Sequence, residues 1–339
     1  MRNLVMGLAK GYNWYILEPF VRSFIKNVPS ADLVLFTDKF SPFTLDRLQS
    51  IGGGRIKIEP YPEYAKNARP NNIRWKIFLD YIKIHGANYA QILTSDTRDV
   101  IFQSDIFKEF ENQSNYLGYS TEGDNIKGEK SKCVLNYDWL IESFGKAVAD
   151  KFADKEIICD GTVIGTTNEM KIFFEKMIEY MPNFNSGHDQ IVMQYIIYNN
   201  LFPLENLIKI SYYDGAIFTT SVYATYNPIK TRDNFILSPN GRIPAVVHQY
   251  DRPQKELNDF VERIYRQRDF KFDEHLVDIE SIFDQIAPLV YSENWKDLLT
   301  VFVIYFMDNK SYFYNKTDFS VSNAGNPYRK FGGYLLTVW

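Results

Sequence analysis

Short apolar runs with the character of β-strands recur through the N-terminal third of the chain. The segments between them place apolar residues at helical spacing. Such alternation of strands and helices is typical of an α/β fold with a largely parallel sheet. The predicted strands are residues 3–8, 32–37, 55–60 and 89–94.

Three segments have the periodicity of amphipathic helices. Residues 71–84 carry their apolar side chains in a single stripe, with Arg74 near its edge. Residues 168–181 repeat apolar positions at alternating spacings of three and four, behind a Thr-Asn cap and ahead of Pro182. A further helix is predicted over residues 188–200.

The middle of the chain is less regular. The stretch STEGDNIKGEKSK, residues 120–132, is polar and predicts a mobile loop, whose length suits either a lid or an exposed excursion. A strand follows over residues 157–167, interrupted by Asp160 and Gly161, and irregular strands end within residues 243–256.

The pattern changes again near residue 254, beyond which only helices are predicted. They occupy residues 254–268, 275–290 and 294–307 and are followed by an aromatic-rich tail. The sequence thus divides into an α/β domain, residues 1–253, and a helical C-terminal extension, residues 254–339.

Composition narrows the classes of function. The 339 residues include 38 Lys and Arg against 42 Asp and Glu, so the net charge of −4 offers no general attraction to nucleic acid. The only cysteines, Cys133 and Cys159, are too few for a disulfide framework and are expected to be buried reduced thiols. With no apolar run of signal-peptide length at the N-terminus, a cytoplasmic location is expected.

The longest apolar run, residues 298–307, has about half the length that a helix needs to cross a bilayer. It is expected either to complete the core or to dock the protein peripherally on a membrane.

Candidate chemistry begins in the stretch ILTSDTRDVIF, residues 92–102. Asp96 and Asp99 follow the predicted strand at its carboxyl end, which is where open α/β sheets bind ligands. Two carboxylates on one turn attract Mg²⁺ or Mn²⁺. The structural alternative is that Asp96 caps the turn and Asp99 pairs with Arg98. A haloacid dehalogenase phosphatase would need an acid where Arg98 stands, which argues against that class.

This strand and acidic turn resemble the metal-binding region of GT-A fold glycosyltransferases, in which a D-x-D motif or a variant of it holds a metal against the donor diphosphate. Here the spacing is Asp96-Thr97-Arg98-Asp99. The resemblance implies a Rossmann-like mixed sheet flanked by helices, a nucleotide-sugar co-substrate and a bound divalent metal.

A second match lies in VVHQYDRPQK, where His248 follows a short apolar run. It is similar to the H-x-x-G-x-x-K-P segment of family 8 glycosyltransferases and implies that His248 is the third metal ligand. Asp251 replaces the glycine, and the lysine is displaced to Lys255 with Arg252 nearer, so both basic residues are candidates for contact with the diphosphate. An imidazole beside two carboxylates suits Mn²⁺ better than Mg²⁺. A structural role for His248 is the alternative.

Two further segments resemble the sugar-binding part of these enzymes. In CDGTVIGTTNEM, Asp160 binds either sugar hydroxyls or local backbone, since burial without partners is costly, and Gly161 permits close approach of a ligand. In GHDQIVMQYII, Asp189 and Gln190 open a helix. If the reaction inverts the configuration at the anomeric centre, Asp189 is the candidate base. If the reaction retains that configuration, Asp189 is expected to hold sugar hydroxyls instead. A favourable helix-dipole position is the structural alternative for Asp189.

The loop after the first strand, AKGYNWY, is placed to meet the nucleotide. Tyr12 is expected to stack on the base and Lys10 to contact phosphate, while Arg74 resembles the basic residue that reaches the diphosphate. Neither a P-loop nor a dinucleotide-binding glycine motif is present in the sequence.

Together these matches imply a metal-dependent glycosyltransferase of polysaccharide biosynthesis. The expected donor is a UDP-sugar, with a GDP-sugar as the second choice, and the expected acceptor is a hydroxyl of a glycan or a lipid-linked glycan. A nucleotidyltransferase, or a non-catalytic glycan-binding or partner-binding protein on the same scaffold, is the alternative.

Overall fold

The computed structural model describes residues 1–128, 131–252, 255–266, 328–331 and 334–337. The described residues up to Arg266 belong to one compact unit, and the described residues 328–331 and 334–337 belong to a second. The first unit carries all of the candidate site residues. It is described first.

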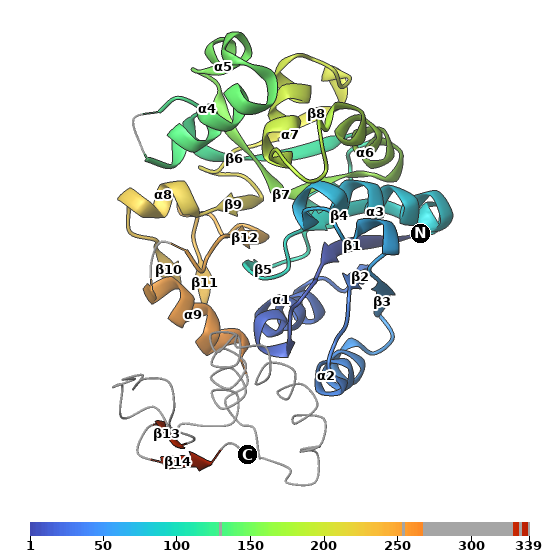
Figure 1. Ribbon diagram of the computed structural model, residues 1–339, viewed down its shortest axis with the longest axis vertical. Coiled ribbons are helices and arrows are strands. Elements are labelled where there is room, and N and C mark those ends of the chain that lie inside the picture. The colour runs from blue at the N-terminus through green and yellow to red at the C-terminus, as the bar shows by residue number, and fades with distance from the viewer. Residues whose placement is uncertain (129–130, 253–254, 267–327, 332–333, 338–339) are drawn as a thin grey trace. The chain divides into compact units, whose positions relative to one another are not determined.

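A seven-stranded mixed sheet forms the centre of the first unit, in the order β3-β2-β1-β4-β7-β6-β8 (Figure 1). The first four strands in this order are parallel, whereas β7 is antiparallel to both of its neighbours, β4 and β6. The four strands predicted in the N-terminal third and the strand around Asp160 are confirmed. The strands are β1 Arg2–Leu8, β2 Ala31–Thr37, β3 Ile56–Pro60, β4 Tyr89–Ser95, β6 Leu117–Asn125, β7 Glu156–Thr166 and β8 Leu207–Ile210.

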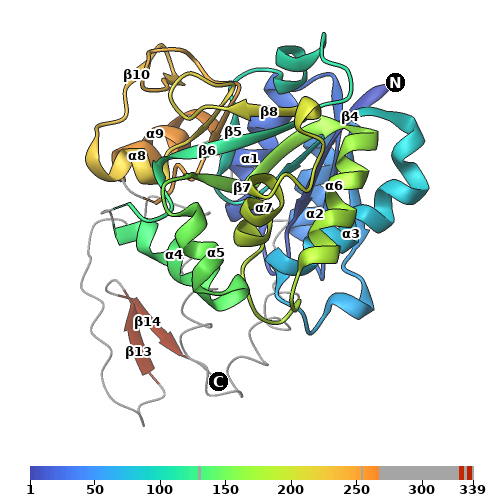
Figure 2. The ribbon, with the colours of Figure 1, turned by 90° about the horizontal axis from the view of Figure 1, so that it is seen from above.

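Helices cover both faces of this sheet (Figure 2). Helices α3, α6 and α7 pack on one face and α1 and α2 on the other. The three helices predicted from periodicity are confirmed as α3, α6 and α7. The α-helices are α1 Trp14–Asn27, α2 Pro42–Gly52, α3 Pro70–His85, α4 Ser131–Phe144, α5 Lys146–Phe152, α6 Thr167–Tyr180, α7 Asp189–Tyr198, α8 Ser221–Tyr226 and α9 Lys255–Tyr265. Single turns of 3₁₀-helix lie at Glu63–Ala65, Gly86–Asn88, Ile106–Phe110 and Leu204–Asn206.

The two-residue repeat of the strands builds a core on each face of the sheet. In β1, Leu4 and Met6 join the cluster beneath α3 and α6, whereas Val5 joins the cluster beneath α1. Alternate strand residues point to opposite faces. Because both faces are covered, the strands appear in the sequence as continuous apolar runs.

A second, three-stranded sheet lies beside the carboxyl end of β4 and was not expected from the sequence. Its order is β5-β12-β9, with β12 antiparallel to β5 and parallel to β9. The register pairs Val100 with His248, so a turn near residue 99 is joined to a strand almost 150 residues later. The strands are β5 Val100–Phe102, β9 Ile217–Thr219 and β12 Val246–His248, and a separate hairpin is formed by β10 Thr231–Arg232 and β11 Phe235–Ile236.

The prediction of a mobile loop over residues 120–132 was wrong at both ends of that range, whereas Ile126 and Lys127 form a turn. Strand β6 continues to Asn125 and pairs with β7, and α4 begins at Ser131. Ser120, Thr121 and Glu122 are buried in this strand, and Glu122 and Asn136 each accept a hydrogen bond of 3.2 Å from Nε2 of the Gln190 side chain. Burial raises the pKa of Glu122 above its ordinary value.

The part of the predicted extension that the structure describes contains a helix and a hairpin. Helix α9 lies within the first unit, where the Tyr15 hydroxyl donates to Glu262 at 3.3 Å and the Arg266 guanidinium stacks 3.5 Å from the centre of the Tyr15 ring. In the second unit β13 Tyr328–Phe331 and β14 Tyr334–Thr337 pair in antiparallel fashion, where only helices and a tail were expected.

The predicted helices over residues 275–290 and 294–307, including the apolar run 298–307, lie outside the described residues. Among the helices that are described, none combines the length and hydropathy required to cross a bilayer.

Replacement of Phe102 by alanine is expected to lower the free energy of unfolding by about 3–5 kcal/mol. Phe102 is fully buried, and the centre of its ring lies 5.4 Å from that of Phe20 and 5.8 Å from that of Phe24. Denaturant unfolding monitored by circular dichroism measures the change. The control, Ile84→Ala, removes a side chain that is 76% exposed and should change the stability little. Equal effects of the two substitutions would contradict the packing described here.

Candidate active site

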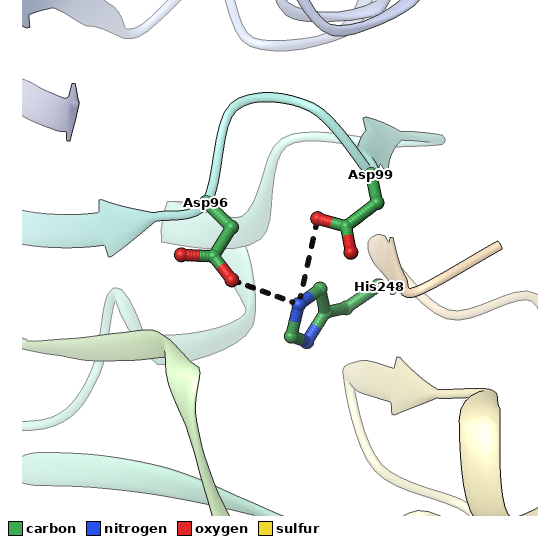
Figure 3. Close-up of side chains that lie close together, drawn as sticks. All are labelled: Asp96, Asp99 and His248. Carbon is green, nitrogen blue, oxygen red and sulfur yellow. Dashed lines mark ion pairs between the residues drawn. The ribbon is translucent and has the colours of Figure 1, made fainter. Parts of the chain in front are cut away.

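Three side chains that could bind a metal ion, two from one turn and the third from almost 150 residues later, meet at the carboxyl end of β4 (Figure 3). Asp96 follows β4, Asp99 precedes β5, and His248 ends β12. The His248 Nε2 atom lies 3.4 Å from Asp96 Oδ2 and 3.8 Å from Asp99 Oδ1. One candidate ligand atom from each residue falls within 4.8 Å of the others. The structure therefore brings together the acidic turn and the imidazole that the sequence analysis placed at one site.

Main-chain hydrogen bonds fix the positions of these residues. The Asp96 amide donates to the Gly161 carbonyl oxygen at 2.8 Å, which ties the end of β4 to β7. The Gln249 amide donates to the Asp99 carbonyl oxygen at 2.7 Å, which extends the pairing of β5 with β12. Gln249 adopts a left-handed backbone conformation, with φ of 62°. The backbone therefore sets the separation of the ligands before any ion is bound.

The surroundings of His248 fit a divalent cation. Its side chain is buried, and within the described part of the chain Nε2 has no hydrogen-bond partner. A buried polar nitrogen without a partner is unusual, and this one faces two carboxylate oxygens. Imidazole nitrogen with carboxylate oxygen is a donor set suited to Mn²⁺.

Arg74, on α3, is the main counterion of the site. Its Nη1 lies 2.7 Å from Asp96 Oδ1, and its Nη2 lies 2.7 Å from both Asp160 Oδ2 and Asp189 Oδ2. The side chain is only 7% exposed. Trp75, the next residue of α3, donates from Nε1 to Asp189 at 3.3 Å. Arg74 thus links a candidate metal ligand to the two acids predicted for the sugar, a role that the sequence did not reveal.

The carboxyl groups of Asp96 and Asp160 respond differently to this environment. Burial raises the pKa of Asp160 well above its ordinary value and the neighbouring Asp189 raises it further, against the opposing effect of Arg74. Burial also acts to raise the pKa of Asp96, but His248 and Arg74 outweigh it and the pKa lies below its ordinary value. Asp160 therefore keeps its proton to a higher pH than a free aspartic acid, whereas Asp96 is a carboxylate.

A pocket of about 250 Å³ opens over Asp96 and Asp99. The loops after β1 and β4 both contribute to it, because neighbouring parallel strands end at the same edge of the sheet. Six residues predicted to bind metal or nucleotide therefore share one pocket. Its walls are formed by Leu8, Lys10, Tyr12, Pro70, Asn71, Arg74, Ser95, Asp96, Thr97, Arg98, Asp99 and Arg252.

Two arginines at the rim give the pocket its capacity for an anion. Arg252 Nη2 lies 2.9 Å from Asp99 Oδ2, and Arg98 Nε lies 3.1 Å from Asp251 Oδ2. Their side chains are 41% and 47% exposed, so both can reach a ligand. In the sequence Arg98 was considered as a partner for Asp99 and as an argument against a phosphatase, but not as a ligand-binding residue. Its position between the two acids of the motif is the signal that could have identified it.

The other predicted site residues, Asp160, Asp189, His248 and Lys255, are not among the residues that line this pocket. Asp189 lines an adjoining pocket of about 220 Å³, which shares Pro70 and Asn71 with the first. Lys255 stands at the start of α9, where Nζ lies 2.6 Å from Asp259; it is not among the residues that line either pocket. Its contact with a diphosphate stays a prediction.

The loop that lines the second pocket is held by Asn72. The side-chain nitrogen Nδ2 of Asn72 donates to the main-chain carbonyl oxygens of Ser186 at 3.0 Å and Phe184 at 3.3 Å. Asn72 and Arg74 therefore both connect α3 with the chain leading into α7. Neither the sequence position of Asn72 nor its residue type indicated this role.

Comparison with known proteins gives distant structural neighbours. No family model and no curated protein matches the chain. An active-site mutant of LgtC is similar over 76% of this chain and 94% of its own, with 16% identity and a TM-score of 0.48. The galactosyltransferase LgtC in complex with donor and acceptor sugar analogues is similar over 77% of this chain and 95% of its own, with 16% identity and a TM-score of 0.45. Core-mannan synthase A of Aspergillus fumigatus in its Mn/GDP form is similar over 62% of this chain and 72% of its own, with 13% identity and a TM-score of 0.39. Because this likeness is distant, the chemistry of the pocket follows from its own residues.

Replacement of Gly161 by alanine is expected to weaken metal binding by at least about tenfold. An added Cβ would lie 2.3 Å from His248 Cε1 and 2.8 Å from Asp96 Oδ2, so it would push two candidate ligands apart. Titration of Mn²⁺ followed by electron paramagnetic resonance measures the affinity. The control is Gly86→Ala, whose Cβ meets only the Thr167 methyl at 3.1 Å and Ile82 Cβ at 3.6 Å. Unchanged Mn²⁺ affinity in Gly161→Ala would contradict this arrangement of ligands.

Replacement of Asp160 by asparagine is expected to increase stability relative to the wild type as the pH rises. Because burial raises the pKa of Asp160, the unfolded chain ionises here first, above about pH 4, and ionisation then favours the unfolded state. The stability contributed by the protonated group is complete below this pH and is lost as the pH rises towards the folded-state pKa. Urea unfolding at about pH 4 and about pH 7 gives the comparison.

The matched control for this titration is Asp150→Asn. Hydrogen bonds from Lys146 and Tyr137 lower the pKa of Asp150. The wild type should therefore gain stability relative to this variant as the pH rises, the opposite sign to that at residue 160. A wild-type to Asp160→Asn difference that does not vary with pH would show that the Asp160 carboxyl titrates as an ordinary acid.

Proposed function

We propose that this protein is a metal-dependent glycosyltransferase of the GT-A type. The observation that carries the proposal is the convergence of Asp96, Asp99 and His248 beside a pocket that Asp96 and Asp99 line together with basic residues. A phosphate-bearing donor needs both a hard cation and positive side chains. A solely structural role for the three ligands leaves His248 Nε2 without an explanation.

The donor in this proposal is a nucleoside diphosphate sugar, with UDP favoured over GDP. Lys10, Arg98, Arg252 and Tyr12 all line the pocket; in this proposal the three basic residues would contact the diphosphate and Tyr12 would stack on the base. Mn²⁺, or Mg²⁺, held by Asp96, Asp99 and His248 would stabilise the negative charge that develops on the leaving diphosphate. Arg74 keeps Asp96 ionised and in position for that task.

The acceptor in this proposal is a hydroxyl of a glycan or of a lipid-linked glycan. Its oxygen forms a bond with the anomeric carbon of the donor as the bond from that carbon to the diphosphate breaks. Asp160 and Asp189 lie on the side of Arg74 away from the metal ligands and are placed to hold sugar hydroxyls. In an inverting reaction Asp189 is the group that takes the acceptor proton. Such an activity belongs to the cytoplasmic synthesis of a polysaccharide or glycolipid, with the C-terminal extension available for peripheral contact with a membrane.

Replacement of Asp96 by asparagine is expected to reduce Mn²⁺-dependent turnover of the donor by about 100-fold or more, because a metal supplies several kcal/mol of charge stabilisation. The assay incubates purified protein with a panel of UDP-sugars and GDP-sugars and detects the released nucleoside diphosphate. The control, Asp150→Asn, alters an acid whose partner is Lys146 at the surface and should retain wild-type turnover.

Two results of this assay would contradict the proposal. One is wild-type protein that releases no nucleoside diphosphate from any donor in the presence of Mn²⁺. The other is release of sugar 1-phosphate in place of nucleoside diphosphate, since that product requires attack at phosphorus and indicates a nucleotidyltransferase.

A further inference from the structure

The imidazole ring of His248 contacts two residues of strand β7, Cys159 and Gly161. Cys159 Sγ lies 3.3 Å from His248 Nδ1. Gly161 lies against the Cε1 and Nε2 edge of the same ring, where no Cβ could fit. Both the cysteine and the histidine are buried, with exposures of 1% and 0%. The thiol is therefore the polar group that meets the far nitrogen of the imidazole.

The hydrogen bonds available to the two ring nitrogens differ. A hydrogen on Nδ1 has the Cys159 sulfur as its acceptor. A hydrogen on Nε2 would have only carboxylate oxygens at 3.4 and 3.8 Å, and Nε2 makes no hydrogen bond to any described residue. Neutral imidazole carries its hydrogen on one nitrogen and a lone pair on the other. The contact with Cys159 is the one hydrogen bond that the described residues offer the ring, and when the sulfur is its acceptor the hydrogen lies on Nδ1 and the lone pair on Nε2.

We propose that Cys159 is a positioning residue for the metal centre: its sulfur accepts the Nδ1 hydrogen of His248 and holds the imidazole with the Nε2 lone pair directed at the space between Asp96 and Asp99. The inference rests on the proposed metal-dependent function. Metal-binding histidines are generally oriented by a partner on the other ring nitrogen, usually a carboxylate, a backbone carbonyl or a water. Here a buried thiol on β7, a strand of the central sheet, takes that place.

The strand around Cys159 supplies a matched control. Ile158, the preceding residue of β7, is fully buried in the cluster beneath α3 and α6, on the other face of the sheet. Ile158→Val removes one buried methylene without touching His248. Cys159→Val keeps a side chain of similar size and removes the acceptor, whereas Cys159→Ser keeps an acceptor in the form of a hydroxyl oxygen.

The experiment measures Mn²⁺ affinity and the histidine tautomer in the full-length protein. Titration followed by electron paramagnetic resonance is expected to show that Cys159→Val binds Mn²⁺ about tenfold more weakly. Cys159→Ser is expected to recover most of that loss, and Ile158→Val to bind as the wild type does. Thermal unfolding without metal reports any loss of stability separately, so a purely structural role for Cys159 would lower the unfolding temperature without the difference between valine and serine.

The tautomer is measured without metal, by ¹⁵N NMR of histidine-labelled protein at about pH 8, where an ordinary imidazole is neutral. Only four histidines are present, and the His248 signal is assigned from its absence in His248→Gln. The wild type is expected to carry the hydrogen on Nδ1. This measurement needs no variant of Cys159 to fold.

Each outcome decides one of the two claims. If the wild type binds Mn²⁺ but Cys159→Val binds it equally well, or if the wild-type hydrogen is found on Nε2, the role of Cys159 is overturned while the metal centre stands. If the wild type binds no Mn²⁺, the metal centre is overturned, and the role of Cys159 with it.

Discussion

The site depends on one buried guanidinium that contacts three carboxyl groups. Without Arg74, Asp160 and Asp189 would lie side by side in the interior with no cationic side chain from the described residues paired to either, and Asp96 would lose its closest positive partner. Removing one partner from a buried ion cluster is far more costly than the net value of the cluster, because the remaining charges have lost their access to water. The packing of α3 against the sheet therefore also organises the charges of the pocket.

The same cluster connects the two halves of the proposed chemistry. On one side of Arg74 stands Asp96, which is ionised and faces the imidazole. On the other side stand Asp160, which retains its proton more readily than a free acid, and Asp189. Carboxyl groups placed a few ångströms apart thus take different protonation states because their neighbours differ. Such division of roles among similar residues is common where acid and base chemistry share a site.

Much of the frame and the main convergence could be predicted from the sequence. Long apolar runs and helical stripes gave the strands and helices of the central sheet, because these elements span enough residues for a period to be visible. Irregular strands were expected up to residues 243–256, but their assembly into a three-stranded sheet was not predicted, because β5, β9 and β12 have three residues each and pair across long stretches of sequence. The polar strand β6 was taken for a loop because its burial depends on partners such as Gln190 that are distant in sequence. Contacts of this kind, including those of Arg74 and Cys159, have no local signature.

The double attachment between α3 and the chain before α7 has a consequence for motion. Asn72 is joined to the carbonyl groups of the 183–187 segment, and two residues further along α3 the Arg74 guanidinium grips Asp189. Two connections so close together prevent a hinge at this point, because any relative rotation would break both of them at once. The boundary between the two pockets is thus cross-linked twice, whereas Arg98 and Arg252 on the wall of the first pocket are half exposed.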